Sequence, residues 1–505
     1  MWMTHILERN RSFHPDRTAL ADERRSVTWA ELENRVENLA GGLLGLGVRP
    51  GDRVAVLSKD RIEVLETYFA LARIGAAFVP LNHGLTRGEL TGILDRARVG
   101  AIIGEAELIA RAEALGLPLS LPYESDHYAA LARTAYDGPL PDVHPDDILA
   151  LFHTSATTGH PKAVVLSHRS LMNVSLGWLA VAEPTDDMVM VNACPLFHGS
   201  FGMSVTYLAA GATVVLMPGF TPQRFLRAVE THRATHAWLV PEMLGFLLRT
   251  AATARTDLSS LREIMYGAAP MPVPLYRDAA RTLGCGFRQV YGMTEVGGSL
   301  ATLAPGEHPS PQDDTVETLP TGRPVPGMSV RIVDRAGREL PAGEIGEVCV
   351  RGDDLMRGYW ADPGGTAKVI RGGWLHTGDL GLVDARGYLW LTDRIKDVII
   401  RGGQNIYPAE LERVLRGHPA VADAAVVAVP DADWGQLPLA YVVRQPGADC
   451  TEQELLELLV AELAPYKRPR GIRFIDTLPT TASGKVLKRV LRELAEAATT
   501  AGDAR

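Results

Sequence analysis

Over its first half, the chain alternates short apolar runs with longer stretches of helical periodicity, and few folds accommodate that alternation. Residues 52–57 and 76–81 read as strands. Residues 28–46 and 62–74 place apolar side chains on one face of a helix, and Thr28 stands where an N-cap is expected. Strands that alternate with helices form parallel sheets covered by helices. The sequence therefore predicts an α/β protein whose large N-terminal domain consists of layered α/β sheets.

The pattern changes in the last third of the chain. Residues 307–323 are rich in Pro, Asp and Thr and lack periodicity, so we expect a surface loop. From 329 to 390, short strands with glycine turns predict a small β subdomain, and an α+β unit follows Ile395. A chain of 505 residues exceeds one hydrophobic core, so two or more domains are expected. The other expected strands are 101–103, 148–152, 213–216, 237–240, 424–429 and 439–443, and the other helices are 409–416 and 452–463.

The charge balance and the cysteine content exclude several classes of protein. The formal net charge is -9, without the basic stripes that bind nucleic acid or the basic clusters that bind membranes. No apolar run reaches the roughly 18 residues of a membrane-spanning helix, and the N-terminus lacks an apolar signal core. We therefore expect a cytoplasmic protein with neither nucleic acid nor membrane as partner. The four cysteines, whose spacing predicts neither disulfides nor a zinc site, are Cys194, Cys285, Cys349 and Cys450.

Lysine is rare in this chain, with seven among 51 basic residues. Such a preference for arginine is typical of GC-rich genomes, and we expect a protein of bacterial secondary metabolism. Each lysine that the chain keeps is therefore a candidate for a chemical role. Three of the seven, Lys162, Lys396 and Lys485, fall inside the motifs described next.

The strongest motif is the polar segment 154–163, with the sequence TSATTGHPKA. It follows the apolar strand 148–152 and precedes a helix expected to start at Ser167. A strand–loop–helix turn of this kind presents backbone N–H groups and hydroxyls to an anion, and Lys162 adds a positive charge. The segment lacks the GxxxxGK[ST] pattern of the common nucleotide-binding loop, and a polar surface loop remains the alternative.

This segment resembles the phosphate loop, [ST]SG[ST]TGxPKG, of the adenylate-forming superfamily of acyl-CoA synthetases, peptide-synthetase adenylation domains and luciferases. Four more motifs follow in the order of that family and span essentially the whole chain. On these five matches, the chain is identified as a member of the superfamily and is most similar to its acyl-CoA ligases. The four are YGMTE at 291–295, WLHTGD at 374–379, DRIK at 393–396 and PTTASGK at 479–485.

The resemblance implies a nucleotide site with named roles. Glu295 would hold Mg²⁺ on the ATP phosphates, a role that suits a carboxylate, and Thr294 would donate to the α-phosphate. Asp379 would accept the ribose hydroxyls and Arg394 would donate to the ribose. A solvated turn carboxylate and a surface ion pair are the alternatives for Glu295 and Arg394. The nucleotide-binding residues implied are Thr154, Ser155, Thr157, Thr158, Lys162, Gly267, Ala268, Ala269, Tyr291, Gly292, Asp379 and Arg394.

The resemblance also implies two half-reactions and a domain rotation between them. Lys485 would stabilise the charge that develops when a carboxylate oxygen attacks the α-phosphorus. An N-terminal domain of residues 1–393 would join a mobile C-terminal domain of residues 397–505 through a hinge at 394–396, with Lys396 as hinge residue. Residues 398–408 read as a hairpin followed by a helix, and the hairpin would line the tunnel for coenzyme A. The coenzyme A contacts implied are Arg401, Gly402 and Gly403.

His198 matches a position beside the acyl group in the family, and we expect it to act in catalysis together with Lys485, Thr294 and Glu295. Relatives that activate amino acids carry a Phe-Asp pair near this point, whereas this chain has Phe197 and His198. That difference argues against an α-amino acid substrate. Glycines nearby suggest a roomy pocket, although turns explain them equally well. The acyl-pocket residues expected are His198, Phe201, Gly202, Trp238, Met293 and Gly297.

The phosphate loop departs from the family pattern at Ala156 and Ala163, where glycine is usual. If either position needs a positive φ, the strain is about 1–3 kcal/mol, which slows adenylation roughly tenfold to a hundredfold. Two hypotheses follow: a complete ligase that uses ATP, Mg²⁺, coenzyme A and a small carboxylic acid, or a ligase that converts preformed acyl-AMP to the thioester. A ligase that loads a carrier protein or an amine, and a non-catalytic binding relative, are further alternatives. A homodimer is a further expectation.

Overall fold

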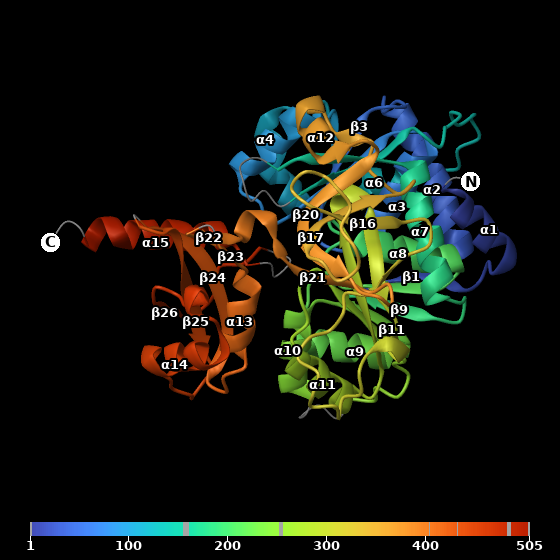
Figure 1. Ribbon diagram of the computed structural model, residues 1–505. Helices are drawn as coiled ribbons and strands as arrows, with labels where there is room; N and C mark the ends of the chain where they lie inside the picture. The colour runs from blue at the N-terminus through green and yellow to red at the C-terminus, as the bar shows by residue number, and fades with distance from the viewer. Residues whose placement is uncertain are drawn as a thin grey trace. The chain divides into compact units, whose positions relative to one another are not determined.

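The computed structural model describes residues 3–154, 161–251, 256–402, 404–431, 433–481 and 486–502. Its elements are labelled in Figure 1, and the chain divides into two compact units. The first unit comprises Met1–Ser329 and Arg351–Leu375, and the second comprises Val330–Val350 and His376–Arg505. The expected α/β class is confirmed, because parallel strands alternate with helices through the first unit.

One sheet of the first unit has the strand order β18-β8-β7-β4-β3-β5-β6. Its central strands are parallel, whereas β8 runs antiparallel to both of its neighbours. The strands are β3 (Arg53–Leu57), β4 (Ala77–Leu81), β5 (Ala101–Gly104), β6 (Leu119–Pro122), β7 (Ile148–His153), β8 (Ala163–Ser167) and β18 (Gly358–Tyr359). The helices between them are α2 (Trp29–Gly45), α3 (Ile62–Arg73), α4 (Arg87–Ala97), α5 (Ala106–Ile109), η1 (Ala110–Leu115) and α6 (Asp126–Leu131).

The second sheet of this unit has the order β15-β14-β13-β12-β11-β9-β10-β1-β2. Its strands are β1 (Thr18–Ala21), β2 (Ser26–Thr28), β9 (Val189–Asn192), β10 (Thr213–Leu216), β11 (His236–Leu239), β12 (Glu263–Gly267), β13 (Gly286–Met293), β14 (Gly298–Leu303) and β15 (Arg323–Pro324). The helices are α1 (His5–Phe13), α7 (His168–Ala182), α8 (Ser200–Ala210), α9 (Pro222–His232), α10 (Pro241–Ala251), α11 (Val273–Leu283), η2 (Thr294–Val296) and η3 (Pro305–Glu307), and α12 (Pro363–Val369) leads into β19 (Ile370–Arg371).

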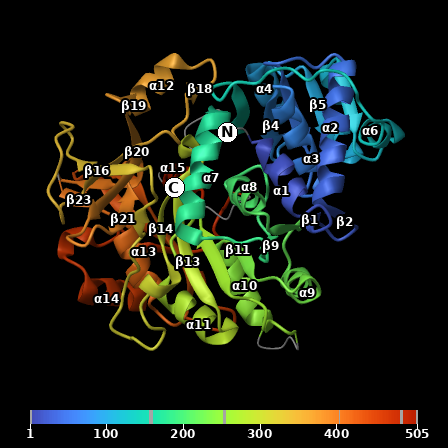
Figure 2. The ribbon, with the colours of Figure 1, turned by 90° about the vertical axis from the view of Figure 1, so that its right-hand side faces the viewer.

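Figure 2 shows α7 and α8 between the two sheets of the first unit. Helix α8 is buried from Ser200 to Leu208, on all of its faces. A helix that is apolar all round is stable only where neighbours cover every side, as they do between two layers. The half-buried His198 and the exposed Gly199 lead directly into this buried helix.

The segment after the phosphate loop differs from the expectation. The sequence predicted that the loop leads directly into a helix at Ser167, but strand β8 lies between them and pairs with β7. The run Ala-Val-Val-Leu-Ser contains two β-branched residues, which favour a strand, and β7 offers it an edge. Ser167 is the N-cap of α7, as expected, and accepts a hydrogen bond from the Ser170 N–H. The loop is therefore the connection of a β-hairpin.

The other strands of the chain form two smaller sheets. The first, of order β16-β17-β20-β19 with β21 beside β20, confirms the expected β subdomain. The second has the order β23-β22-β25-β24, with β26 beside β25. The strands are β16 (Ser329–Val333), β17 (Gly346–Arg351), β20 (Trp374–Val383), β21 (Leu389–Arg394), β22 (Ile399–Arg401), β23 (Gln404–Ile406), β24 (Val421–Asp431), β25 (Gly435–Arg444) and β26 (Ile472–Phe474). The helices are η4 (Ile395–Asp397), α13 (Pro408–Arg416), α14 (Glu452–Glu462), η5 (Pro465–Lys467) and α15 (Lys488–Gly502).

Among the described helices, none combines the length and the apolar character needed to cross a lipid bilayer.

Candidate active site

The β7–β8 hairpin brings the two ends of the predicted phosphate loop together. The Thr154 N–H donates to the Lys162 carbonyl oxygen at 3.0 Å, and the Lys162 N–H donates to Thr154 Oγ1 at 3.4 Å. These two bonds close the base of the loop and fix the point from which the Lys162 side chain leaves. Ser155, Thr157 and Thr158, predicted to bind nucleotide, lie outside the described residues together with Ala156.

Ala163 does not carry the strain considered for it. It is the first residue of β8 and pairs with His153. Its φ is not positive. The Trp360 N–H also donates to its carbonyl oxygen at 2.8 Å, as in a regular ladder. An extended alanine costs nothing relative to glycine. Of the two departures from the family pattern, only Ala156 still gives a reason to expect impaired adenylation.

Lys162 and Glu295, which come from distant parts of the sequence, meet at the two ends of Tyr359. The Lys162 ammonium lies 4.4 Å from the centroid of the Tyr359 ring, and the Tyr359 hydroxyl donates to Glu295 Oε1 at 2.8 Å. Tyr359 and Glu295 are buried. Burial and the neighbouring Glu295 carboxylate raise the pKa of the Tyr359 hydroxyl, so it stays a donor. The phosphate loop and the predicted metal ligand thus share one neighbour.

Tyr359 was missed in the sequence because its partners are not local. The Gly-Tyr-Trp run at 358–360 contains no Asp, Glu, His, Lys, Arg or Cys and forms only a two-residue strand, β18. Its place follows from pairing with β8, in which Gly358 faces Val165 and Tyr359 faces Val164. The signal that the sequence offered for Tyr359 was an aromatic residue after a glycine, and this pattern by itself predicts no chemical role.

Glu295 sits on a turn whose geometry its glycines set. Strand β13 ends at Met293, η2 follows, and Gly297 reverses the chain with a φ of +68°. A Cβ on Gly292 would lie 1.8 Å from the Gly298 carbonyl oxygen, so only glycine fits this bulge. The Glu295 carboxylate and the Thr294 hydroxyl are hard oxygen donors of the kind that Mg²⁺ takes from proteins, and they fit the predicted metal.

The strand end predicted to lie beside adenine adjoins a predicted acyl-pocket residue. A Cβ on Gly267 would approach the Val290 carbonyl oxygen to 2.3 Å and the Trp238 ring to 3.0 Å. The next residue, Ala268, has a φ of +66°, an uncommon conformation for a residue with a side chain. Strained residues of this kind cluster at functional sites. Ala269 follows directly, in the turn before α11.

The other predicted acyl-pocket residues lie in different surroundings. Gly202 faces the turn after Glu295, since a Cβ there would lie 3.3 Å from the Gly297 carbonyl oxygen. Phe201 instead packs into the core, with ring centroids 4.5 Å from Tyr68 and 5.4 Å from Phe152. Burial lowers the pKa of His198 to about 4, so its ring is neutral at pH 7. Met293 ends β13, directly before Thr294.

Asp60 fixes the segment that carries His198. Its carboxyl oxygen Oδ1 accepts the Leu196 N–H at 2.9 Å, and both residues line a small cavity with Phe197. Burial raises the pKa of Asp60 to about 8. No motif marked Asp60, because its partner lies far along the chain. Since Asp60 holds the backbone two residues before His198, it sets where the imidazole lies.

In the second unit, Asp379 and Arg394 are direct partners across β20 and β21. Arg394 Nε lies 2.9 Å from Asp379 Oδ1, and Asp379 is buried whereas Arg394 is partly exposed. The Asp379 N–H donates to Thr377 Oγ1 at 3.0 Å, and the Thr377 hydroxyl donates to the Val348 carbonyl oxygen at 2.8 Å. This arrangement presents a fixed carboxylate and a fixed guanidinium side by side, which suits a diol such as ribose.

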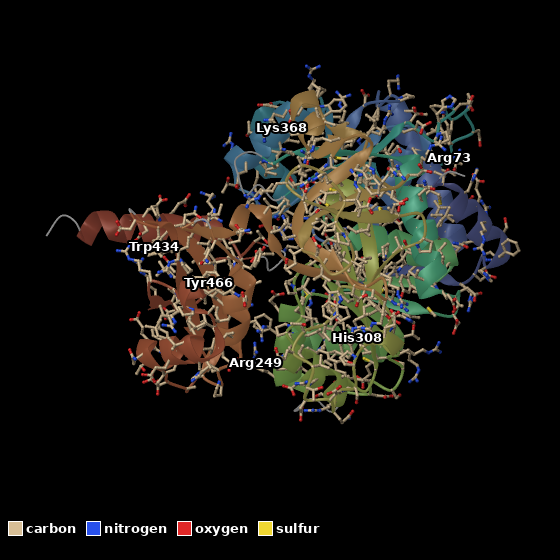
Figure 3. All side chains as sticks on the ribbon, in the orientation of Figure 1. Arg73, Arg249, His308, Lys368, Trp434 and Tyr466 are labelled. Atoms are coloured by element: carbon tan, nitrogen blue, oxygen red, sulfur yellow. The ribbon has the colours of Figure 1, made fainter. Side chains whose placement is uncertain are left out.

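The predicted coenzyme A hairpin is formed by β22 and β23. Trp434, labelled in Figure 3, lies against Gly402 at the tip of the hairpin. Gly402 has a φ of +54°, and a Cβ there would lie 2.9 Å from the Trp434 ring. The Arg401 guanidinium lies 5.2 Å from that ring, and 51% of Trp434 is exposed. An exposed aromatic ring beside a guanidinium offers stacking and charge to a nucleotide. Gly403 lies outside the described residues.

Lys485 also lies outside the described residues, whereas Lys396 lies in η4. Burial lowers the pKa of Lys396. Both assignments stay predictions.

One further cluster of titratable side chains holds β17 against β20. His376 Nδ1 lies 2.7 Å from Glu347 Oε2 and 3.3 Å from Cys349 Sγ. His376 precedes Asp379 by three positions on the same strand, so it faces the opposite side of the sheet. These contacts fix the strand that presents Asp379.

Comparisons with known proteins agree with this geometry. The family described as "AMP-binding enzyme" matches residues 7–360, and "AMP-binding enzyme C-terminal domain" matches residues 410–485. A feruloyl-CoA synthase of Amycolatopsis is 41% identical over 95% of this chain and 96% of its own. A fatty acid–[acyl-carrier-protein] ligase, ScoC, of Streptomyces coeruleorubidus is 37% identical over 95% of both chains. The crystal structure of the anthranilate CoA ligase AuaEII with anthranoyl-AMP covers 99% of this chain and 98% of its own, with a TM-score of 0.90 and 28% identity.

Proposed function

Because this chain belongs to the AMP-binding enzyme family and is an adenylate-forming acid–thiol ligase, we propose that it catalyses both half-reactions itself. The products would be acyl-CoA, AMP and diphosphate. The observation that carries the proposal is the pair of contacts through which Tyr359 holds Lys162 and Glu295. A protein that only consumed preformed acyl-adenylate would need neither a cation at the phosphate loop nor a metal-binding carboxylate.

In the first half-reaction, a carboxylate oxygen of the acid attacks the α-phosphorus and diphosphate leaves. Lys162 would bind the leaving phosphates, and Glu295 would hold Mg²⁺, which neutralises phosphate charge when it is bound. Asp379 and Arg394 would fix the ribose. Lys485 would stabilise the charge that develops between the carboxylate and the α-phosphate.

In the second half-reaction, the thiol of coenzyme A attacks the acyl carbonyl carbon and AMP leaves. We propose that the Arg401–Gly402 hairpin takes the pantetheine arm and that Trp434 stacks on the adenine of coenzyme A. The left-handed Gly402 supports this role, because a side chain there would meet the Trp434 ring. The domain of residues 397–505 would rotate about the hinge at 394–396 between the two steps.

The acid is proposed to be aromatic or otherwise bulky and apolar. His198 is neutral and half-buried, and Trp238 is almost fully buried, so the predicted pocket offers no charge to an ammonium group. The feruloyl and anthranilate ligases in the comparison are named for aromatic acids. We further propose a cytoplasmic homodimer that uses Mg²⁺-ATP and coenzyme A.

The proposal is tested by separating the two half-reactions. Acid-dependent exchange of labelled diphosphate into ATP is measured with ferulate, anthranilate and fatty acids, and thioester formation is measured from synthetic acyl-AMP with coenzyme A. Both activities are expected for an aromatic acid. Lys485→Ala should abolish exchange and keep the second activity, whereas Lys368→Ala, at an exposed lysine, should keep both.

Three other outcomes would contradict the proposal. Thioester formation from acyl-AMP alone, without exchange for any acid, would identify a ligase of preformed adenylates. Exchange with no transfer to coenzyme A would favour a carrier protein or an amine as acceptor, and ScoC is named for a carrier protein. Neither activity, with tight acid or nucleotide binding, would identify a binding protein.

A further inference from the structure

The segment that carries Tyr359 is anchored to both parts of the predicted phosphate-binding site in the first unit. The Arg357 N–H donates to the Val165 carbonyl oxygen at 3.0 Å, and the Trp360 N–H donates to that of Ala163 at 2.8 Å. The Met356 N–H donates to the Glu295 carbonyl oxygen at 2.8 Å. Tyr359 is therefore fixed by backbone bonds to the strand after Lys162 and to the turn that carries Glu295.

The tyrosine side chain separates two opposite charges that would otherwise attract each other. Lys162 lies against the ring, Glu295 accepts from the hydroxyl, and these two described residues make no ion pair with each other. A direct pair would neutralise both groups in the absence of nucleotide. With the ring between them, the ammonium stays available to phosphate and the carboxylate stays available to a cation.

The hydroxyl also orients the carboxylate. A hydrogen bond to an ionised acceptor is roughly twice as strong as a neutral one, and it occupies Glu295 Oε1. The second oxygen is then held in one direction, as the strict octahedral geometry of Mg²⁺ requires. Removing a group that orients a metal ligand in this way typically lowers the metal affinity about tenfold to a hundredfold.

We propose that Tyr359 is a positioning residue for metal-bound ATP: its hydroxyl orients Glu295 toward the cation, and its ring holds Lys162 apart from Glu295. The inference rests on the proposed function and deepens it. It separates the two roles chemically, because the hydroxyl serves the metal and the ring serves the phosphate. Two substitutions at one position therefore give different results.

The test compares ATP affinity with Mg²⁺ and with EDTA, by isothermal titration calorimetry on the full chain. The ratio of the two affinities measures the contribution of the metal. Tyr359→Phe keeps the ring and should lower that ratio about tenfold to a hundredfold, with the metal-free affinity unchanged. Tyr359→Leu removes the ring as well and should also weaken metal-free binding. Tyr388→Phe, at another buried tyrosine beside an arginine, should leave the ratio unchanged.

A second readout excludes a merely structural role. Thioester formation from supplied acyl-AMP needs neither Mg²⁺ nor the leaving phosphates, so Tyr359→Phe should keep that rate. An unchanged ratio in Tyr359→Phe would overturn the inference, and so would an equal loss of both half-reactions with a lowered melting temperature. If the wild-type protein binds ATP with the metal dependence described but makes no thioester, the proposed function fails and the role of Tyr359 stands.

Discussion

Lys488 and Glu412 form an ion pair in the interior of the second unit, with Nζ 2.8 Å from Oε1. Only 17% of the lysine side chain and 9% of the glutamate side chain are exposed. Burial alone would lower the pKa of Lys488, but the carboxylates of Glu412 and Asp393 outweigh it and raise that pKa. The pair joins α15 to α13, and Asp393 lies directly before the predicted hinge. The helix that follows the predicted catalytic lysine is therefore anchored beside the hinge.

The first prediction concerns this pair. Lys488→Met should lower the free energy of unfolding of the second unit by about 3–5 kcal/mol, because it leaves the buried Glu412 carboxylate without its main partner. Urea unfolding, followed with the wild-type protein alongside, measures the change. Lys368→Met provides the matched control at an exposed lysine and should change the stability by less than about 0.5 kcal/mol. A similar small change in Lys488→Met would show that the pair adds little.

The second prediction concerns Asp379. Asp379→Asn should lower kcat/KM for ATP roughly tenfold to a hundredfold, because a charged acceptor for the ribose hydroxyls is lost and Arg394 loses its partner. The KM of the acid should change little. Steady-state kinetics with ATP varied at saturating acid and coenzyme A provides the measurement. Asp384→Asn, on the same β-hairpin, is the control and should leave kcat/KM for ATP unchanged. A variant whose loss lay wholly in the acid KM would contradict the assignment.

Local patterns predicted the helices well, because hydrogen bonds between residues close in the sequence form them. Thr28 caps α2 with a capping box completed by Glu31, as its position before the apolar periodicity indicated. The family motifs pointed to Glu295, Asp379 and Arg394, whose roles stay predictions. The sequence did not show which distant segments pair. Strand β18 lies beside β8, and this pairing alone places Tyr359 between Lys162 and Glu295. Strand β8 was missed for the same reason, since an apolar run of five residues fits a strand or a helix until an edge is available.

The third prediction concerns the phosphate loop. Ala163→Gly should not raise the rate of diphosphate exchange, because Ala163 is already in an extended strand. It should lower stability by about 0.5–1 kcal/mol, the usual cost of a strand glycine. Ala156→Gly, made alongside, tests the other departure from the family pattern. A tenfold faster exchange in Ala163→Gly would show that the methyl group obstructs the phosphates and would contradict this account.

Several histidines of the first unit are buried or half-buried and neutral, and this sets how its stability depends on pH. Burial lowers the pKa of each to about 4, well below the usual 6.5. Between these two values the unfolded chain binds more protons than the folded one, so the free energy of unfolding falls as the pH drops. The stability is complete above about pH 6.5. The histidines are His153, His168, His198, His236 and His308.

The fourth prediction isolates one of these groups. His168 is 1% exposed, and neither ring nitrogen has a hydrogen-bond partner among the described residues. Burial, partly opposed by the Asp147 carboxylate, lowers its pKa to about 4. His168→Leu should therefore flatten the fall in unfolding free energy between pH 6.5 and 4, and at pH 7 it should leave stability equal or higher, because no hydrogen bond is lost. Urea unfolding at four pH values across this range measures the slope, and a slope equal to that of the wild-type protein would show that His168 is not protonated on unfolding.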